Sequence, residues 1–84
     1  MSDHPVVQFP SYRCRVFSNG DECLGTEAFT ARRSDEVWHE ASMSACELIR
    51  NAYGRMEPGF DWRMEVLDPA DRIIYQFSFK AEAL

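Results

Sequence analysis

The side chains suited to nucleophilic or metal chemistry are few and widely spaced. The 84-residue chain has three cysteines, Cys14, Cys23 and Cys46, and two histidines. His39 and Cys46 are separated by about two helical turns, so the two side chains cannot share a metal ion by themselves. Cys14 and Cys23 can approach each other only across a hairpin. No nucleophile–base motif flanks these residues, and we expect Cys14 and Cys46 to be small apolar core side chains.

Carboxylates gather on one face of a predicted helix, where Glu36, Glu40 and Glu47 share the polar arc. Paired carboxylates can act as acid and base, but acids also line ordinary solvated helices. The chain has no glycine-rich phosphate-binding motif. We therefore expect no enzyme. An alternative role for this acidic surface is that of a small acidic inhibitor, of the phage anti-defence or antitoxin type, which occupies the basic nucleic-acid-binding site of its target.

Basic side chains form a third candidate group. Arg13, Arg15 and Arg63 alternate with apolar residues, and Lys80 and Phe17 are expected on the same face. Such side chains can contact phosphates and stack on bases. However, 9 basic against 14 acidic residues give a formal net charge of −5, the wrong sign for a general nucleic-acid coat or an anionic-membrane binder. The simpler interpretation is a solvated sheet face, part of which is covered in a dimer.

The elements that must position these groups begin with a hairpin and a helix. Side chains alternate from Tyr12 to Ser18, which is typical of a half-buried strand. The Asn19-Gly20 pair tolerates the positive φ of a type I′ turn, and a weaker second strand is expected at about residues 22–26. Ser34 is a good N-cap for a helix over residues 35–53. One arc of that helix is apolar and includes Trp38 and three alanines.

A second hairpin follows the helix. Asp61–Leu67 alternates again, residues 68–71 suit a type I turn, and Ile73–Phe79 places Ile73 with the aromatic residues of the strand on one face. The order ββαββ predicts an α+β fold, in which one helix covers one face of a four-stranded antiparallel sheet. The predicted sheet side of the core comprises Tyr12, Cys14, Val16, Trp62, Met64, Val66, Tyr75, Phe77 and Phe79.

The length fits one domain, predicted to span residues 12–84 after a flexible lead at 1–11. A hydrophobic content of 45% excludes a disordered chain, and no apolar run reaches the roughly 20 residues of a membrane-spanning helix. The cysteine number is odd and the first residues lack the basic and apolar regions of a signal peptide. We therefore expect a cytoplasmic protein with no membrane partner.

The opposite face of the sheet is predicted to be uncovered and to mix basic with apolar side chains, including Leu67 and Ser78. Such a face is a plausible place for a partner or a second copy of the chain. We expect a non-enzymatic interaction or regulatory module, with a protein partner or itself as the ligand and without cofactor or metal. The candidate interaction surface comprises Arg13, Arg15, Phe17, Arg63, Glu65, Ile74, Gln76 and Lys80.

The second hairpin also resembles a known family. The run from Trp62 to Val66, the Asp68-x-x-Asp71-Arg72 turn and the strand that follows it resemble a small bacterial family of ββαββ proteins of unknown function, common in alphaproteobacteria. The resemblance spans most of residues 12–84 and implies the fold but no activity. One departure lies in the turn, where the family usually has glycine in place of Asp71. Another lies near Gly25, where the second strand is expected to differ in shape.

Overall fold

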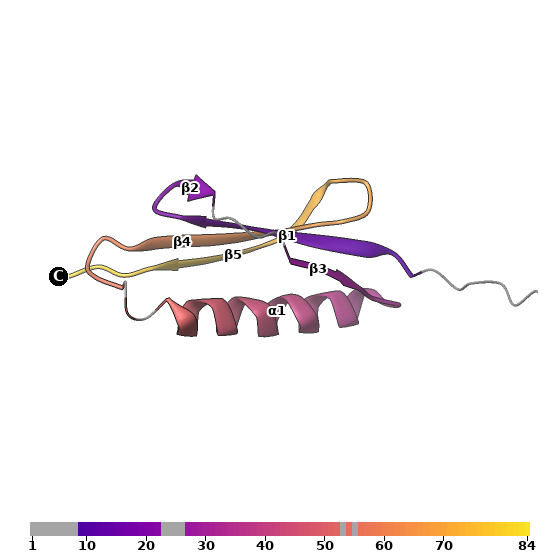
Figure 1. Cartoon of the computed structure of the whole chain (residues 1–84), viewed down its shortest axis with the longest axis horizontal. Coiled ribbons are helices and arrows are strands. Elements are labelled where there is room, and N and C mark those ends of the chain that lie inside the picture. Colours follow the sequence, from indigo (N-terminus) through magenta and orange to yellow (C-terminus); the bar gives the residue numbers. More distant parts are fainter. Residues whose placement is uncertain (1–8, 23–26, 53, 55) are drawn as a thin grey trace, which may run out of the picture.

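A computed structural model describes residues 9–22, 27–52, 54 and 56–84. In Figure 1 a single long helix lies along one face of an antiparallel sheet, which confirms the α+β class and the ββαββ order. The strand order β2-β1-β4-β5 places β1 and β4 in the middle and β5 at one edge. The elements are β1 Ser11–Ser18, β2 Asp21–Glu22, β3 Glu27–Thr30, α1 Ser34–Asn51, β4 Asp61–Leu67 and β5 Ile73–Lys80.

Two described strands lie beside β1 on its side away from β4. Both β2 and β3 pair with β1 on the edge opposite β4, so the described strands fill four positions of the sheet. Most of the strand predicted at about residues 22–26 lies outside the described residues, since 23–26 are not described. Beyond its predicted end, β3 extends the pairing with β1 to Thr30. A stacked aromatic pair helps to hold β3, since the rings of Tyr12 and Phe29 lie 5.8 Å apart.

The first turn has the predicted conformation and also fixes the register of the central strands. Asn19 and Gly20 have φ of 52° and 85°, as a type I′ turn requires. The backbone N–H of Asn19 donates to the carbonyl oxygen of Asp61 at 2.7 Å, and the N–H of Asp61 donates to Asn19 Oδ1 at 3.0 Å. The hairpin tip is thus tied to the first residue of β4.

The helix begins one residue earlier than predicted and ends two residues earlier, so Arg33 rather than Ser34 is the N-cap. No side chain caps it from that position. Instead, Glu36 Oε2 accepts a hydrogen bond from the backbone N–H of Arg32 at 2.9 Å. An acid in the first turn is also favourable to the helix dipole. The guanidinium of Arg33, hydrogen-bonded to Asp35, lowers the pKa of that carboxyl group.

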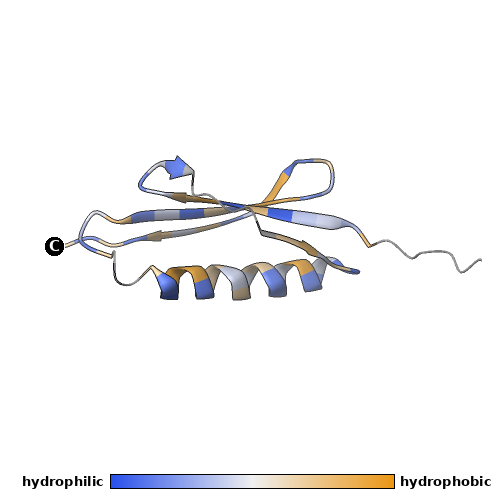
Figure 2. Ribbon diagram, in the orientation of Figure 1, coloured by the Kyte–Doolittle hydropathy of each residue, from blue (hydrophilic) through white to orange (hydrophobic). Residues whose placement is uncertain are grey.

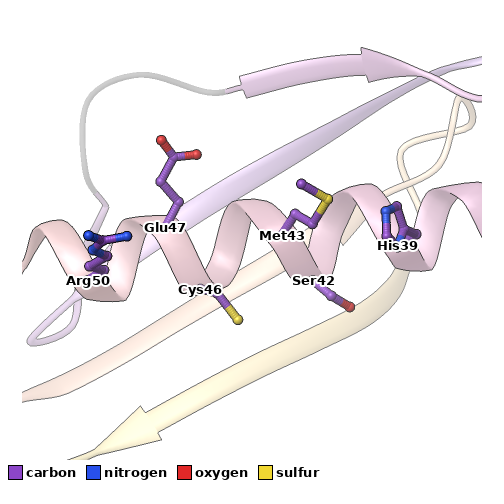
Figure 3. A pocket seen from close by; sticks show the side chains of 6 residues that line it. All are labelled: His39, Ser42, Met43, Cys46, Glu47 and Arg50. Atoms are coloured by element: carbon purple, nitrogen blue, oxygen red, sulfur yellow. The ribbon is translucent and has the colours of Figure 1, made fainter.

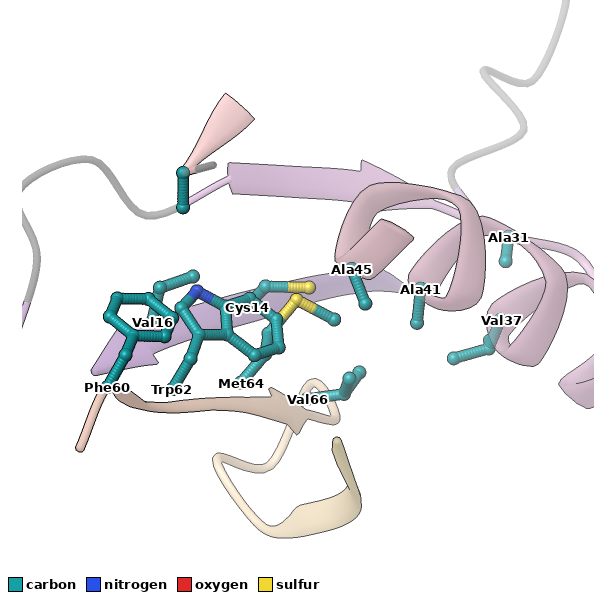
Figure 4. Close-up of a cluster of buried hydrophobic side chains, with 11 residues drawn as sticks. Cys14, Val16, Ala31, Val37, Ala41, Ala45, Phe60, Trp62, Met64 and Val66 are labelled. Atoms are coloured by element: carbon teal, nitrogen blue, oxygen red, sulfur yellow. The ribbon is translucent and has the colours of Figure 1, made fainter. Parts of the chain in front are cut away.

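The core lies between α1 and the two central strands (Figure 4). Small residues, Ala41 and Ala45, face the sheet from the helix and are 0% and 6% exposed, so the helix backbone lies close to β4. Of the predicted sheet core, Tyr12, Tyr75 and Phe77 are only half-buried. Five others are buried: Cys14, Val16, Trp62, Met64 and Val66.

Three apolar side chains predicted to be buried are exposed instead. Trp38 and Phe79 are 50% and 37% exposed, and Cys46 is also exposed. The reason is the strand order, since β5 lies at the edge of the sheet while the fully buried sheet residues belong to β1 and β4. The helix covers the centre of the sheet and leaves its β5 side partly open.

A bulge changes the facing of the residues that begin β5. Val66 pairs with Tyr75 but Leu67 pairs with Ile73, so Ile74 is the extra residue. Cross-strand partners share a face, and Ile73 therefore belongs with Leu67 on the outer face rather than with Tyr75, as predicted. Leu67 is itself only 3% exposed, which corrects its predicted place among the exposed residues of that face.

The turn between β4 and β5 is organised by one carboxylate. Asp68 is 8% exposed, and its Oδ1 accepts hydrogen bonds from the backbone N–H groups of Ala70 and Arg72, each at 2.9 Å. Its Oδ2 accepts from Arg72 Nε at 2.9 Å. The backbone N–H of Asp71 donates to the Asp68 carbonyl oxygen at 2.9 Å, which closes the predicted turn.

Acid is expected to weaken this turn. The backbone N–H of Arg72 holds the pKa of Asp68 below its ordinary value. The ionised carboxylate therefore stabilises the fold at pH values above the unfolded-state pKa of about 3.9. This contribution is lost as the pH falls through the lower pKa of the folded state. We expect Asp68→Asn to be less stable than the wild type at pH 7, with the difference shrinking by pH 3. Urea midpoints at both pH values measure this, with Asp21→Asn as control. Equal acid sensitivity of Asp68→Asn and wild type would contradict it.

Candidate interaction surface

The uncovered face of the sheet is built by alternate residues of three strands. Figure 2 shows hydrophilic and hydrophobic residues alternating along β4 and α1. On the outer face, Arg15 lies opposite Glu65, which lies opposite Gln76, and Phe17 lies opposite Arg63. The register thus gathers side chains from distant parts of the sequence into one surface, as predicted from alternation alone.

A cluster of two arginines and one glutamate occupies the centre of this face, and we call it the Arg–Glu–Arg cluster: Arg15, Glu65 and Arg63. Arg15 Nη2 lies 2.9 Å from Glu65 Oε1, and Arg63 Nε lies 3.7 Å from Glu65 Oε2. The arginine side chains are 37% and 43% exposed but that of Glu65 only 10%. One carboxylate therefore serves two guanidinium groups, and the cluster carries one surplus positive charge.

The guanidinium groups are held in place by more than Glu65. Arg63 lies over the ring of Phe17, 4.3 Å from its centroid, a cation–π arrangement that fixes the orientation of the charge. The Nε atoms of Arg15 and Arg63 are buried and have no hydrogen-bond partner among the described residues. The cluster is thus pre-positioned, while its hydrogen-bonding capacity is incompletely used.

The basic side chains at the margins of the face are neutralised locally. Arg13 forms an ion pair with Asp71, and Lys80 Nζ lies 3.1 Å from Glu82 Oε1. Gln76 Nε2 donates to Ser78 Oγ at 3.3 Å. The surplus positive charge therefore lies at the Arg–Glu–Arg cluster rather than across the whole face. The counter-ions Asp71 and Glu82 were missed from the sequence, although their positions next to the strand ends were the available signal.

Comparison with known proteins identifies the family of the chain. A family model described as a domain of unknown function, DUF6894, matches residues 12–80. The chain belongs to this family. No curated protein and no solved structure matches it.

Asp71 of this DUF6894 chain stands where the resemblance leads us to expect glycine. Asp71 has a φ of 64°, in the left-handed region, where glycine is unstrained and Asp is among the few other residues tolerated. Here the aspartate forms the ion pair with Arg13 that glycine cannot form. The aspartate thus places a counter-ion on the outer face from a strained backbone position.

The other predicted members of the candidate surface differ in accessibility. Arg13, Gln76 and Lys80 are exposed, and Phe17 is half-buried. Ile74 is 39% exposed at the bulge of this DUF6894 domain. Glu65 is 8% exposed, so it holds the arginines in place rather than presenting a charge to solvent, which corrects its place in the predicted contact surface.

The helix surface of the domain carries a shallow hollow. Six residues line it, and all of these described lining residues come from α1 (Figure 3). Ser42 Oγ donates to the Trp38 carbonyl oxygen at 2.7 Å, a bond within the helix. Among the described residues no group of three His, Cys, Asp or Glu could hold a metal ion. In the same part of the chain, no helix is long and apolar enough to cross a membrane.

The acids of the alternative surface are not equivalent. Glu40 and Glu47 are exposed, whereas Glu36 is half-buried and accepts the hydrogen bond from the Arg32 N–H. Arg50 lies near Glu47 at the hollow on the same helix, as Figure 3 shows. The helix of this DUF6894 domain therefore presents a mixed rather than a uniformly acidic face.

Proposed function

We propose that this domain is a non-enzymatic interaction module of the bacterial cytoplasm, and that its outer sheet face binds an acidic segment of another protein. The observation that carries the proposal is the Arg–Glu–Arg cluster, in which two guanidinium groups share one carboxylate. A carboxylate from a partner would supply the second counter-ion. Arginine is well suited to this task because its planar fork can bind a carboxylate through two hydrogen bonds.

The amount of charge favours a protein partner over nucleic acid. With Arg13 and Lys80 each paired to an acid, the face offers one surplus positive charge, whereas nucleic-acid binding rests on several simultaneous phosphate contacts. The whole chain carries −5, which would repel a polyanion. An acidic protein segment that places one carboxylate at the cluster needs only one such contact, and it carries far less negative charge than a polyanion.

The alternative proposal, an acidic inhibitor acting through Glu36, Glu40 and Glu47, has weaker support. Glu36 is already bonded within the chain, which leaves two exposed acids with Arg50 beside one of them. A mimic of a nucleic-acid backbone needs a longer row of negative charges to cover a basic site. This alternative predicts that the wild type captures a nuclease in a salt-sensitive manner. It would be favoured if Glu40→Gln/Glu47→Gln lost this capture while the outer-face variants below kept it.

Arg15→Gln/Arg63→Gln is expected to lose partner binding. Removing both guanidinium groups eliminates the charge-assisted hydrogen bonds, each worth about 1.5–3 kcal/mol, so affinity should fall at least about tenfold. The measurement is affinity capture from the native host, identification of the captured protein, and titration of that purified protein against wild type and variant by calorimetry. Circular dichroism checks that the variant is folded.

Two matched variants sharpen this test. Arg50→Gln removes one arginine from the exposed helix and should bind like the wild type, whereas Arg15→Lys/Arg63→Lys keeps the charge but loses the planar fork and should bind with intermediate affinity. If Arg15→Gln/Arg63→Gln captures and binds the partner as tightly as Arg50→Gln does, the proposal is contradicted. Binding of labelled RNA or DNA by the wild type, abolished in Arg15→Gln/Arg63→Gln, would overturn it in favour of a nucleic-acid ligand.

A further inference from the structure

The outer edge of β5 has no neighbouring strand among the described residues. Edge strands are usually protected by charges, prolines or bulges. Here the bulge lies at one end, at Ile74, and the charge of Lys80 at the other. The five residues from Tyr75 to Phe79 include no charge, proline or bulge.

An apolar margin accompanies this edge on the helix side. A groove of about 230 Å³ lies between α1 and β5, lined by Ile49, Trp62, Phe77 and Phe79 among others. Farther along the edge, the half-exposed Trp38 packs on Phe77, with ring centroids 5.1 Å apart. The edge is therefore bordered by exposed aromatic and aliphatic surface over much of its length.

The hydrogen-bond pattern shows which backbone groups of β5 are available. The N–H of Ala81 donates to the Phe60 carbonyl oxygen at 2.9 Å, and the Ala81 carbonyl oxygen accepts from the Gly59 N–H at 2.8 Å. Both groups of Ala81 thus point toward the β4 side. Because this direction alternates along an antiparallel strand, the N–H and C=O groups of Gln76 and Ser78 point outward.

The residue sequence of this edge reads nearly the same in both directions. Tyr75-Gln76-Phe77-Ser78-Phe79 alternates aromatic and polar side chains symmetrically about Phe77. We propose that a second copy of the chain pairs its β5 antiparallel to this edge, with the two-fold axis at Phe77. This register places Gln76 opposite Ser78 of the second copy on the outer face, and aromatic residues opposite one another on the helix face.

The register agrees with the backbone geometry. Gln76 and Ser78, whose groups point outward, become the hydrogen-bonded pairs, each exchanging two backbone hydrogen bonds. Phe77 meets its own copy in a non-hydrogen-bonded pair, where Cα atoms approach to about 4.5 Å rather than about 5.5 Å and side chains are closer. Aromatic cross-strand pairs are among the more stabilising ones. The polar pairs are uncharged, so no like charges meet across the axis.

The apolar margin supplies the remaining contact area. The eight-residue strand offers a strip roughly 27 Å long and 10 Å deep. The area of this strip alone is smaller than the area of about 800 Å² that each partner of a stable complex buries. A two-fold axis perpendicular to the sheet places both α1 helices on the same side of the joined sheet. The exposed apolar surface around Trp38 and Phe79 of one copy then adjoins the same surface of the other copy. The outer face with the Arg–Glu–Arg cluster stays open, and this inference is independent of its function.

The test is the mass in solution of the full chain and of two matched variants. Sedimentation equilibrium should give twice the monomer mass of 9.7 kDa. Ser78→Pro removes an outward N–H, which an edge strand tolerates, and should raise the dimer Kd at least about tenfold, since symmetry removes the bond twice. Ser78→Thr keeps the N–H and should remain dimeric. A monomeric wild type at millimolar concentration, or a Ser78→Pro dimer as tight as that of Ser78→Thr, would overturn the proposal.

Hydrogen exchange of the wild type gives a readout that does not depend on the folding of a variant. Protection of the Gln76 and Ser78 amides should rise with protein concentration, while that of Phe77, already bonded toward β4, should change little. Protection that is independent of concentration contradicts self-pairing. So does protection that appears in a monomer only on addition of a foreign peptide, an outcome that assigns the edge to another chain.

Discussion

Met64→Ala is expected to lower the free energy of unfolding by about 3 kcal/mol, within the range found for removal of a buried methionine side chain. Met64 lies in the centre of β4, is 0% exposed, and faces the helix among the buried side chains (Figure 4). A domain of this size has only about 4–13 kcal/mol of stability in total. The loss should therefore shift the urea midpoint to a clearly lower concentration and lower the thermal midpoint.

The chain offers a control of the same residue type. Met43 lies on the exposed face of α1 and is 57% exposed, so Met43→Ala should change stability by no more than about 0.5 kcal/mol. Both variants are measured by urea unfolding followed by circular dichroism. Similar effects of the two substitutions would show that the face of α1 or of β4 buried in the protein has been assigned incorrectly.

The parts of the fold that were predictable are those encoded by neighbouring residues. Alternation in β4 predicted the facing of Met64, because a period of two has only one alternative register. The Asn19-Gly20 pair predicted its own turn because few dipeptides accept positive φ twice in succession. Most of the outer-face surface followed from the same alternation, and with it the proximity of Arg15 to Arg63.

The errors concern properties set by the arrangement of elements. Trp38 and Phe79 have the spacing of core residues, but their exposure depends on β5 being an edge strand, and strand order leaves no local signal. Ile73 changed face because of a bulge after the turn, which alternation cannot register. Glu65 was predicted to face a partner, and it does lie on the outer face. Its burial comes from two arginines, Arg15 on the neighbouring strand and Arg63 on its own.

Glu65→Gln is expected to lower the free energy of unfolding by about 2 kcal/mol. Removing one member of a buried ion pair costs about 3–5 kcal/mol, and the value here is smaller because Arg15 and Arg63 are 37% and 43% exposed. Without the carboxylate, the two guanidinium groups repel each other across the strand pair. This repulsion is screened by salt, so the deficit measured by urea unfolding should shrink when sodium chloride is raised.

Two further variants separate this explanation from loss of packing. Glu47 lies exposed on α1, and Glu47→Gln should change stability by no more than about 0.5 kcal/mol. Adding Arg63→Gln to Glu65→Gln removes the repulsion and should recover about 1 kcal/mol, a coupling that a double-mutant cycle measures. Strictly additive effects would mean that Glu65 does not hold the arginines in place. A measured coupling would show that the surplus positive charge of the cluster is held at a fixed position on the outer face, which specific binding of an acidic partner requires.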